Sequence, residues 1–120
     1  MASILIADDS DAIRLVLRDI VEIGKHTVVG EAIDGADTIE KYPQLKPDLL
    51  LLDLAMPKKD GLTVIYEIME MDPKAKIILI TAADNIKIID KCLEGGAKTY
   101  IDKPFEFEQV LKIIDKILKK

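Results

Sequence analysis

Reactive side chains follow directly on four apolar runs of this chain. The runs and the residues behind them are 3–7 with Asp8-Asp9, 49–52 with Asp53, 77–80 with Thr81, and 99–102 with Lys103-Pro104. Carboxylates, a hydroxyl and an amine are groups that hold a divalent cation and the oxygens of a phosphoryl group. If the runs end side by side, these residues outline a site for metal and phosphate.

The apolar runs are the elements that must position these groups. Continuous apolar runs of this length are typical of strands that are buried on both faces, as in parallel sheets. Open parallel sheets bind their ligands outside the carboxyl ends of the strands. We therefore expect the reactive side chains to gather at one edge of a sheet.

Strands and helices are predicted to alternate along the whole chain. The predicted strands are 3–7, 27–32, 49–52, 77–80 and 98–102, and 27–32 is placed nearer a sheet edge because it is less apolar. The first predicted helix starts at Ser10 or Asp11 and ends at Gly24, and the second follows Asp34-Gly35. The third contains 62–69, the fourth runs from an Asp84 cap to Gly95-Gly96, and the fifth follows Pro104 as far as Leu118. This alternation predicts an α/β domain over residues 1–120, with a parallel sheet and helices on both faces.

Composition limits the class of protein. The 120 residues are 49% hydrophobic and 32% charged, which is typical of a folded domain. The net charge of −5 argues against a nucleic-acid partner, and no apolar stretch reaches the ~20 residues of a membrane span, so we expect no membrane insertion. We see no export signal, and a single cysteine fits a reducing compartment. We therefore expect a cytoplasmic protein with Cys92 in its core.

The Asp8-Asp9 pair favours a hard divalent cation. Adjacent carboxylates repel each other unless they share a cation. Oxygen ligands suit Mg²⁺ or Mn²⁺, whereas zinc prefers nitrogen and sulfur, and the single histidine, His26, lies far from the other motifs. Alone, the pair would be read as acids favoured at a helix start. Together with Asp53 and Lys103, it favours a metal site.

Asp53 is the predicted nucleophile, because a carboxylate can attack phosphorus to form an acyl phosphate. A divalent cation and Lys103 can offset the charge on the transferring oxygens. Thr81 offers a hydroxyl for one phosphoryl oxygen, although a β-branched residue at a strand end is equally well explained by the strand itself. The bond before Pro104 can be cis or trans, and the sequence leaves this open.

Other phosphate-site and hydrolase motifs are absent from the sequence. There is no G-x-x-x-x-G-K-[ST] loop, and the first predicted strand-to-helix turn has no glycine, which excludes P-loop enzymes and dinucleotide-binding domains. There is no G-x-S-x-G motif for acyl transfer. A haloacid-dehalogenase-type phosphatase would carry D-x-D after the first strand, whereas the candidate nucleophile here follows the third.

The chain resembles the receiver domain of two-component response regulators, and is similar end to end to the stand-alone chemotaxis (CheY-type) members. The matching residues are Asp8-Asp9, Asp53, Met56-Pro57, Gly61, Thr81-Ala82, Tyr100 and Lys103-Pro104-Phe105. The resemblance implies a flavodoxin-like (βα)5 fold with strand order 2-1-3-4-5. It also implies a single receiver domain, residues 1–120, without an output domain.

The resemblance further implies a role for each matching residue. Asp53 is the implied phosphoacceptor. The implied metal ligands are Asp8, Asp9, Asp53 and the backbone carbonyl of Ala55; the phosphoryl contacts and switch residues are Thr81, Ala82, Lys103 and Tyr100; and the partner face is Tyr100, Ile101 and Phe105. Tyr100 alternates with Ile101, so the two side chains should point to opposite faces of the sheet. An ordinary core tyrosine is the alternative to a switch at this position.

Alanines replace polar residues at two positions. Ala55 and Ala83 stand two residues after Asp53 and Thr81, where amides or acids are frequent in chemotaxis members. An alanine cannot orient a water molecule for loss of the phosphoryl group. Asp102 is also an uncommon charge beside the lysine, and we expect it to face solvent.

Three functions remain open. The favoured one is a monomeric switch, with no enzymatic activity beyond its own phosphorylation and slow dephosphorylation. A histidine kinase of the chemotaxis type phosphorylates Asp53, and the altered surface then binds a downstream motor or adaptor protein. A phosphatase is a further expected partner. The alternative is a phosphorelay intermediate that passes the phosphoryl group to a histidine phosphotransfer protein. The third is a phosphatase, for which sustained product release would replace a stoichiometric burst.

Overall fold

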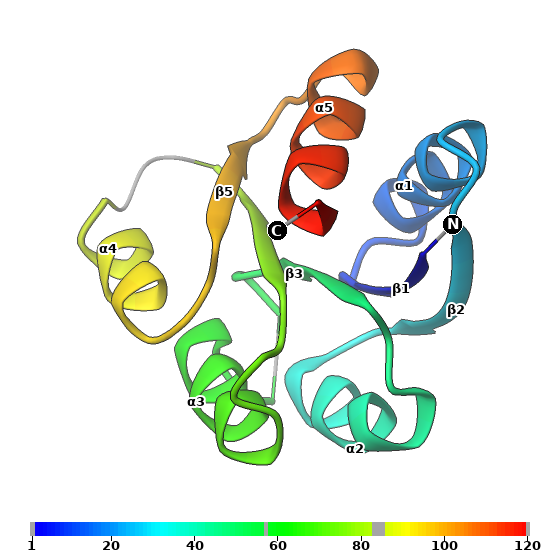
Figure 1. Cartoon of the computed structure of the whole chain (residues 1–120). Coiled ribbons are helices and arrows are strands. Elements are labelled where there is room, and N and C mark those ends of the chain that lie inside the picture. Colours follow the sequence, from blue (N-terminus) through cyan, green and yellow to red (C-terminus); the bar gives the residue numbers. More distant parts are fainter. Residues whose placement is uncertain (1, 57, 83–85, 120) are drawn as a thin grey trace.

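The computed structural model describes residues 2–56, 58–82 and 86–119. Within these residues, five parallel strands form one sheet in the order β2-β1-β3-β4-β5 (Figure 1). The strands are β1 (Ser3–Ala7), β2 (Thr27–Ala32), β3 (Leu49–Asp53), β4 (Ile77–Thr81) and β5 (Thr99–Asp102). The predicted strand order and the edge position of 27–32 are both confirmed. Because β3 and β4 each extend one residue beyond the predicted run, Asp53 and Thr81 are strand residues.

The helices alternate with the strands and cover both faces of the sheet. They are α1 (Asp11–Ile23), α2 (Gly35–Leu45), α3 (Gly61–Met71), α4 (Ile86–Glu94) and α5 (Phe107–Leu118). Helices α1 and α5 lie on one face, and α2, α3 and α4 lie on the other (Figure 1). The α/β architecture predicted from the sequence is therefore confirmed.

The alternation of side chains along the central strands divides the core in two. In β3, Leu50 and Leu52 pack toward α2, α3 and α4, whereas Leu49 and Leu51 pack toward α1 and α5. All four leucines are at most 1% exposed. Burying such a side chain stabilises the fold by roughly 1.5–3 kcal/mol. The sequence of these strands is an uninterrupted apolar run because both of their faces are covered by helices.

Side-chain caps fix where the helices begin. Ser10 accepts a hydrogen bond from the backbone N–H of Ile13 at 3.2 Å, which sets the start of α1 directly behind β1. In the same way Asp34 and Asp60 accept from the third residue after them and begin α2 and α3. Such a cap contributes about 1 kcal/mol. The expected Asp84 cap lies outside the described residues.

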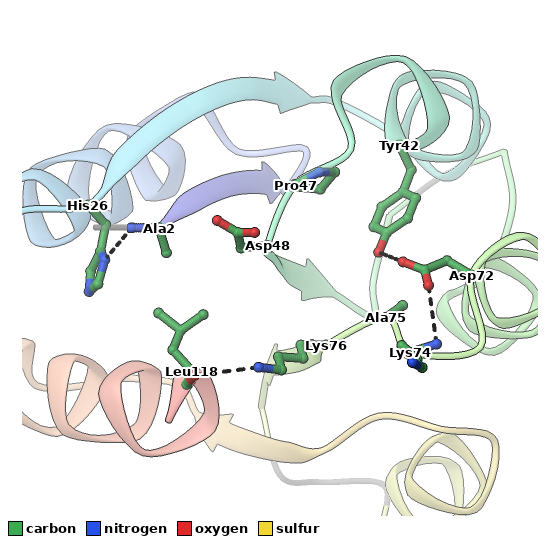
Figure 2. A pocket seen from close by; sticks show the side chains of 10 residues that line it. All are labelled: Ala2, His26, Tyr42, Pro47, Asp48, Asp72, Lys74, Ala75, Lys76 and Leu118. Carbon is green, nitrogen blue, oxygen red and sulfur yellow. Dashed lines mark hydrogen bonds between the residues drawn. The ribbon is translucent and has the colours of Figure 1, made fainter. Parts of the chain in front are cut away.

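A hollow of about 480 Å³ opens at the amino ends of the strands (Figure 2). Two of its polar side chains hydrogen-bond within the protein: the Tyr42 hydroxyl donates to Asp72 at 3.0 Å, and the Lys76 ammonium donates to the carbonyl of Leu118 at 3.4 Å. The hollow therefore lies at the edge opposite the carboxyl ends, away from the predicted site.

Among the described residues, no helix is long and apolar enough to span a membrane.

Candidate functional site

Three carboxylates converge at the carboxyl ends of β1 and β3. Carboxylate oxygens of Asp8, Asp9 and Asp53 all lie within 4.8 Å of one another. They meet because β1 and β3 are neighbouring strands in which Ala7 pairs with Leu52. Asp8 follows Ala7 and Asp53 follows Leu52, so the two acids lie side by side. Asp8 and Asp53 are 1% and 3% exposed, whereas Asp9 is exposed at the mouth of the cluster. The cluster is thus buried at its base and open to solvent at one side.

Lys103 brings an amine to the same cluster. Its Nζ atom lies 3.3 Å from Oδ2 of Asp8 and 3.4 Å from Oδ1 of Asp53. The backbone N–H of Lys103 donates to the carbonyl of Thr81 at 2.9 Å, which holds the turn after β5 against the end of β4. The peptide bond between Lys103 and Pro104 is cis, which the sequence had left open.

The surroundings of Asp53 raise the pKa of its carboxyl group. Burial raises the pKa of its carboxyl group, and the charge of Asp8 raises it further. The backbone N–H of Ala55, which donates to Oδ1 at 3.2 Å, and the Lys103 ammonium lower that pKa in part. A further cation at the cluster would favour the ionised form, which is the nucleophilic one.

Glycines let the loop after Asp53 pack closely against its surroundings. A Cβ atom on Gly61 would lie 2.4 Å from the side chain of Leu54 and 3.1 Å from its Cα, so a larger residue would displace the loop. At Gly35, a Cβ atom would lie 2.3 Å from the carbonyl oxygen of Lys59. These two approaches position the segment that carries Ala55, the residue expected to offer a backbone carbonyl to a metal.

Thr81 and Tyr100 lie beyond the acidic cluster on β4 and β5. Thr81 is 8% exposed, and its hydroxyl donates to the carbonyl of the next residue, Ala82, at 3.3 Å. It would have to rotate to donate toward Asp53. Tyr100 is 38% exposed and is paired with Leu79, whose side chain belongs to the core on the α4 side of the sheet. The ring is therefore on the α4 side and open to solvent.

For one of the three residues expected on the partner face, Ile101, the structure contradicts the expectation. Ile101 is fully buried in the core beneath α5, which contradicts the expectation that it faces a partner. Because β5 is covered on its α5 side, only the opposite side of the strand is open. Phe105 is half-buried against the same core, and Asp102 is exposed, as expected.

Sequence reasoning missed other residues around the site. Ile86 and Phe107 are exposed apolar side chains at the first residues of α4 and α5. Arg14, on α1, donates a hydrogen bond to the backbone of Asp8. The available signal for Arg14 was its spacing, since it shares the buried helix face of Leu17 and Val21. The position of Ala83 lies outside the described residues.

The donor set of the cluster fits a hard divalent cation. Three carboxylates offer only oxygen, the ligand that Mg²⁺ and Mn²⁺ prefer, and the exposed side leaves room for water and phosphate ligands. His26 lies at the other edge of the sheet, where its ring accepts from Ala2 and contacts Asp115. The site therefore combines an acidic cluster that could hold a divalent cation, a buried carboxylate and an amine.

Comparison with known proteins identifies the class to which this fold and site belong. Residues 4–115 match the response regulator receiver domain, so the chain belongs to the receiver domain family. It is similar to the chemotaxis protein CheY of Thermotoga maritima, with 39% identity over 116 residues that cover 97% of each chain. It is also similar to protein CcdB of Bacillus subtilis, with 37% identity over 118 residues and 98% of each chain.

A solved structure shows the same likeness. The crystal structure of a CheX-CheY-BeF3-Mg+2 complex from Borrelia burgdorferi contains a chain that superimposes with a TM-score of 0.93 at 34% identity, covering 98% of this chain and 90% of that one. The receiver-domain resemblance seen in the sequence is confirmed by these matches.

Proposed function

We propose that this receiver domain accepts a phosphoryl group on Asp53 and thereby changes a surface that binds partners. The observation that carries the proposal is the arrangement around one buried carboxylate. Asp53 has the Lys103 amine 3.4 Å away and two further carboxylates within 4.8 Å. This combination of nucleophile, amine and metal-binding oxygens suits phosphoryl transfer, in which most of the catalysis is positioning and charge neutralisation.

The chemistry is a displacement at phosphorus. A carboxylate oxygen of Asp53 attacks the phosphorus of a phosphohistidine on a histidine kinase, so that a P–O bond forms as the P–N bond breaks. The electron pair of the broken bond stays on the imidazole nitrogen, which takes a proton from water. Lys103 offsets the charge of the transferred oxygens. Mg²⁺ or Mn²⁺, held by Asp8, Asp9, Asp53 and the Ala55 carbonyl, would neutralise more of that charge.

The switch follows from the charge that the reaction leaves behind. A phosphoryl group adds three acceptor oxygens, and Thr81 carries the hydroxyl best placed to follow them from its present bond to Ala82. Its movement would vacate space that the half-exposed Tyr100 ring can fill. The surface formed by α4, β5 and α5, which exposes Ile86, Tyr100 and Phe107, then differs between the two states.

The relatives support a chemotaxis role for this switch. A protein named for chemotaxis matches over nearly the whole chain, and the crystal structure of a CheY in complex with CheX, BeF3 and Mg²⁺ is a close structural match. We propose a chemotaxis-type histidine kinase as the donor, a downstream motor or adaptor protein as the target, and a phosphatase as a further partner. These relatives and Tyr100 favour a switch over a phosphorelay intermediate.

The test is phosphorylation of an Asp53→Asn variant. Wild-type protein incubated with acetyl phosphate and Mg²⁺ should gain the mass of one phosphoryl group, and Asp53→Asn should gain none. Asp102→Asn is the matched control, because it removes an exposed acid at the same edge of the sheet and should label like the wild type. Wild-type labelling of Asp53→Asn would refute the assignment.

A further inference from the structure

Arg14 is a buried cation that the chemistry proposed above does not use. It is 9% exposed and shares the buried side of α1 with Leu17 and Val21. Burying a guanidinium is costly unless every donor finds an acceptor. Arg14 shares a helix face with buried leucine and valine side chains, so its guanidinium needs hydrogen-bond acceptors within the protein.

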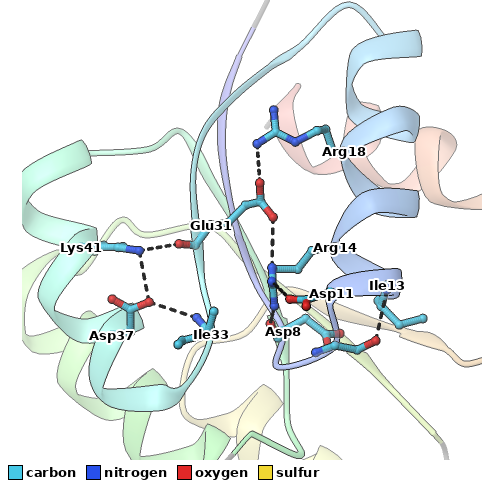
Figure 3. A network of polar contacts seen from close by, with 10 residues as sticks. Asp8, Asp11, Ile13, Arg14, Arg18, Glu31, Ile33, Asp37 and Lys41 are labelled. Carbon is cyan, nitrogen blue, oxygen red and sulfur yellow. Dashed lines mark hydrogen bonds and ion pairs between the residues drawn. The ribbon is translucent and has the colours of Figure 1, made fainter.

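The partners of Arg14 come from separate parts of the chain. Nη1 donates to the backbone carbonyl of Asp8 at 2.7 Å, and Nε donates to a carboxylate oxygen of Glu31 on β2 at 3.0 Å. Nη2 pairs with Asp11 at the start of α1. The second carboxylate oxygen of Glu31 is held by Arg18, one helical turn further along α1 (Figure 3).

These contacts fix the backbone at the acidic cluster. The N–H of Asp8 donates to the carbonyl of Ala32 at 3.0 Å, and the carbonyl of Asp8 is held by Arg14. That carbonyl belongs to the planar peptide unit that leads to Asp9. The orientation of the Asp8 carbonyl thus sets the direction in which the chain enters Asp9, the exposed carboxylate of the cluster. Glu31 in turn holds the fork in place.

We propose that Arg14 is a positioning residue of the metal site: through the Asp8 carbonyl it fixes the Asp8–Asp9 peptide so that both carboxylates face one cation. The proposal rests on the metal-dependent function proposed above. Arginine is suited to this part because its planar fork can donate to a carbonyl and a carboxylate at once, whereas a lysine ammonium has no such fixed geometry. Groups that orient metal ligands without touching the metal typically change metal affinity 10- to 100-fold when removed.

The sign of the effect separates positioning from charge. A positive charge beside a cation site opposes cation binding, so if Arg14 acted only through its charge, its removal would tighten Mg²⁺ binding. If it acts through geometry, its removal weakens Mg²⁺ binding despite the lost repulsion. Retaining the charge in Arg14→Lys should then fail to restore the affinity.

The experiment is calorimetric titration of the purified chain with Mg²⁺ alone, without a phosphodonor. Arg14→Gln and Arg14→Lys should each bind Mg²⁺ about 10-fold more weakly than the wild type, the lower end of the range for such groups. Arg18→Gln is the matched control, since Arg18 pairs with the same Glu31 but lies away from Asp8, and it should bind as the wild type does. Asp9→Ala, which removes a ligand, marks the weakest binding.

Each result decides between the possibilities. Unchanged or tighter binding by folded Arg14→Gln, or full affinity in Arg14→Lys, would overturn the positioning role while leaving wild-type phosphorylation intact. An absence of Mg²⁺ binding by the wild type itself would overturn the proposed function and this inference with it. Thermal melting without Mg²⁺ shows which variants are folded, and if Arg14→Gln is not, Arg14→Lys carries the test.

Discussion

The Nζ atom of Lys103 lies 3.4 Å from Oδ1 of Asp53, although β4 separates the strands from which the two residues extend. The same amine lies 3.3 Å from Asp8. Lys103 thus neutralises two buried carboxylates at the place where a metal would otherwise share them. In the function proposed above, the amine and a divalent cation would compete for these oxygens until a phosphoryl group supplies new ones.

Replacing Lys103 with methionine should therefore have opposite effects on stability and on metal affinity. Leaving the buried carboxylates of Asp8 and Asp53 without the partly buried Lys103 ammonium should lower the free energy of unfolding by about 1–3 kcal/mol in the absence of metal. Mg²⁺ should bind more tightly than to the wild type, because its competitor is gone. Urea unfolding with and without Mg²⁺ measures both, and Lys98→Met serves as control. Weaker Mg²⁺ binding in Lys103→Met would contradict the competition.

The lifetime of the phosphorylated state should depend on Ala55 and Ala83. Neither alanine side chain can hydrogen-bond a water that attacks the phosphoryl group, so we expect slow loss of phosphate from Asp53. Placing Asn at 55 and Glu at 83 should accelerate the loss by roughly 10- to 100-fold, through positioning of the water. Decay of labelled protein after removal of the donor measures the rate. If the double variant decays as slowly as the wild type, water positioning does not limit the reaction.

Phosphorylation should change the surface of α4, β5 and α5. Addition of beryllium fluoride and Mg²⁺, which mimic the phosphoryl group, should shift amide resonances mainly within 81–95 and 99–109. Tyr100→Ala should still be phosphorylated but should lose most of the shifts in α4, because in the proposed switch its ring, on the α4 side of the sheet, links the movement of Thr81 to that helix. Phe107→Ala serves as control, since it alters the surface without removing the link. Shifts confined to the loop after Asp53 would mean that the signal leaves by another route.

Cys92 should be inert in the folded protein. Burial raises the pKa of its thiol to about 11, with a smaller contribution from Asp60, so the thiol stays protonated at pH 8. The thiolate is the reactive form, and the fully buried sulfur is also screened from reagents. Alkylation by iodoacetamide at pH 8 should be slow in buffer and fast in denaturant. Rapid alkylation of the folded chain would show that α4 opens readily from the sheet.

The sequence by itself determined the elements and the edge at which the chemistry lies. Apolar runs ending in Asp8, Asp53 and Thr81 predict parallel strands with these residues at one edge, because burial on both faces requires continuous hydrophobicity. Capping residues such as Ser10 place the helix starts. These are local signals, readable within a few residues, and the structure agrees with them.

Only the tertiary structure decided which side chains meet and which face solvent. Alternation along β5 puts Tyr100 and Ile101 on opposite sides, but only the packing of α5 over one side buries Ile101. The spacing of Arg14 marks a buried helix face, yet its bonds to Asp8 and Glu31 depend on how α1 lies across β1 and β2. Such contacts join segments far apart in the chain, so no local pattern encodes them; they follow from the sheet order and from the helix packing that it imposes.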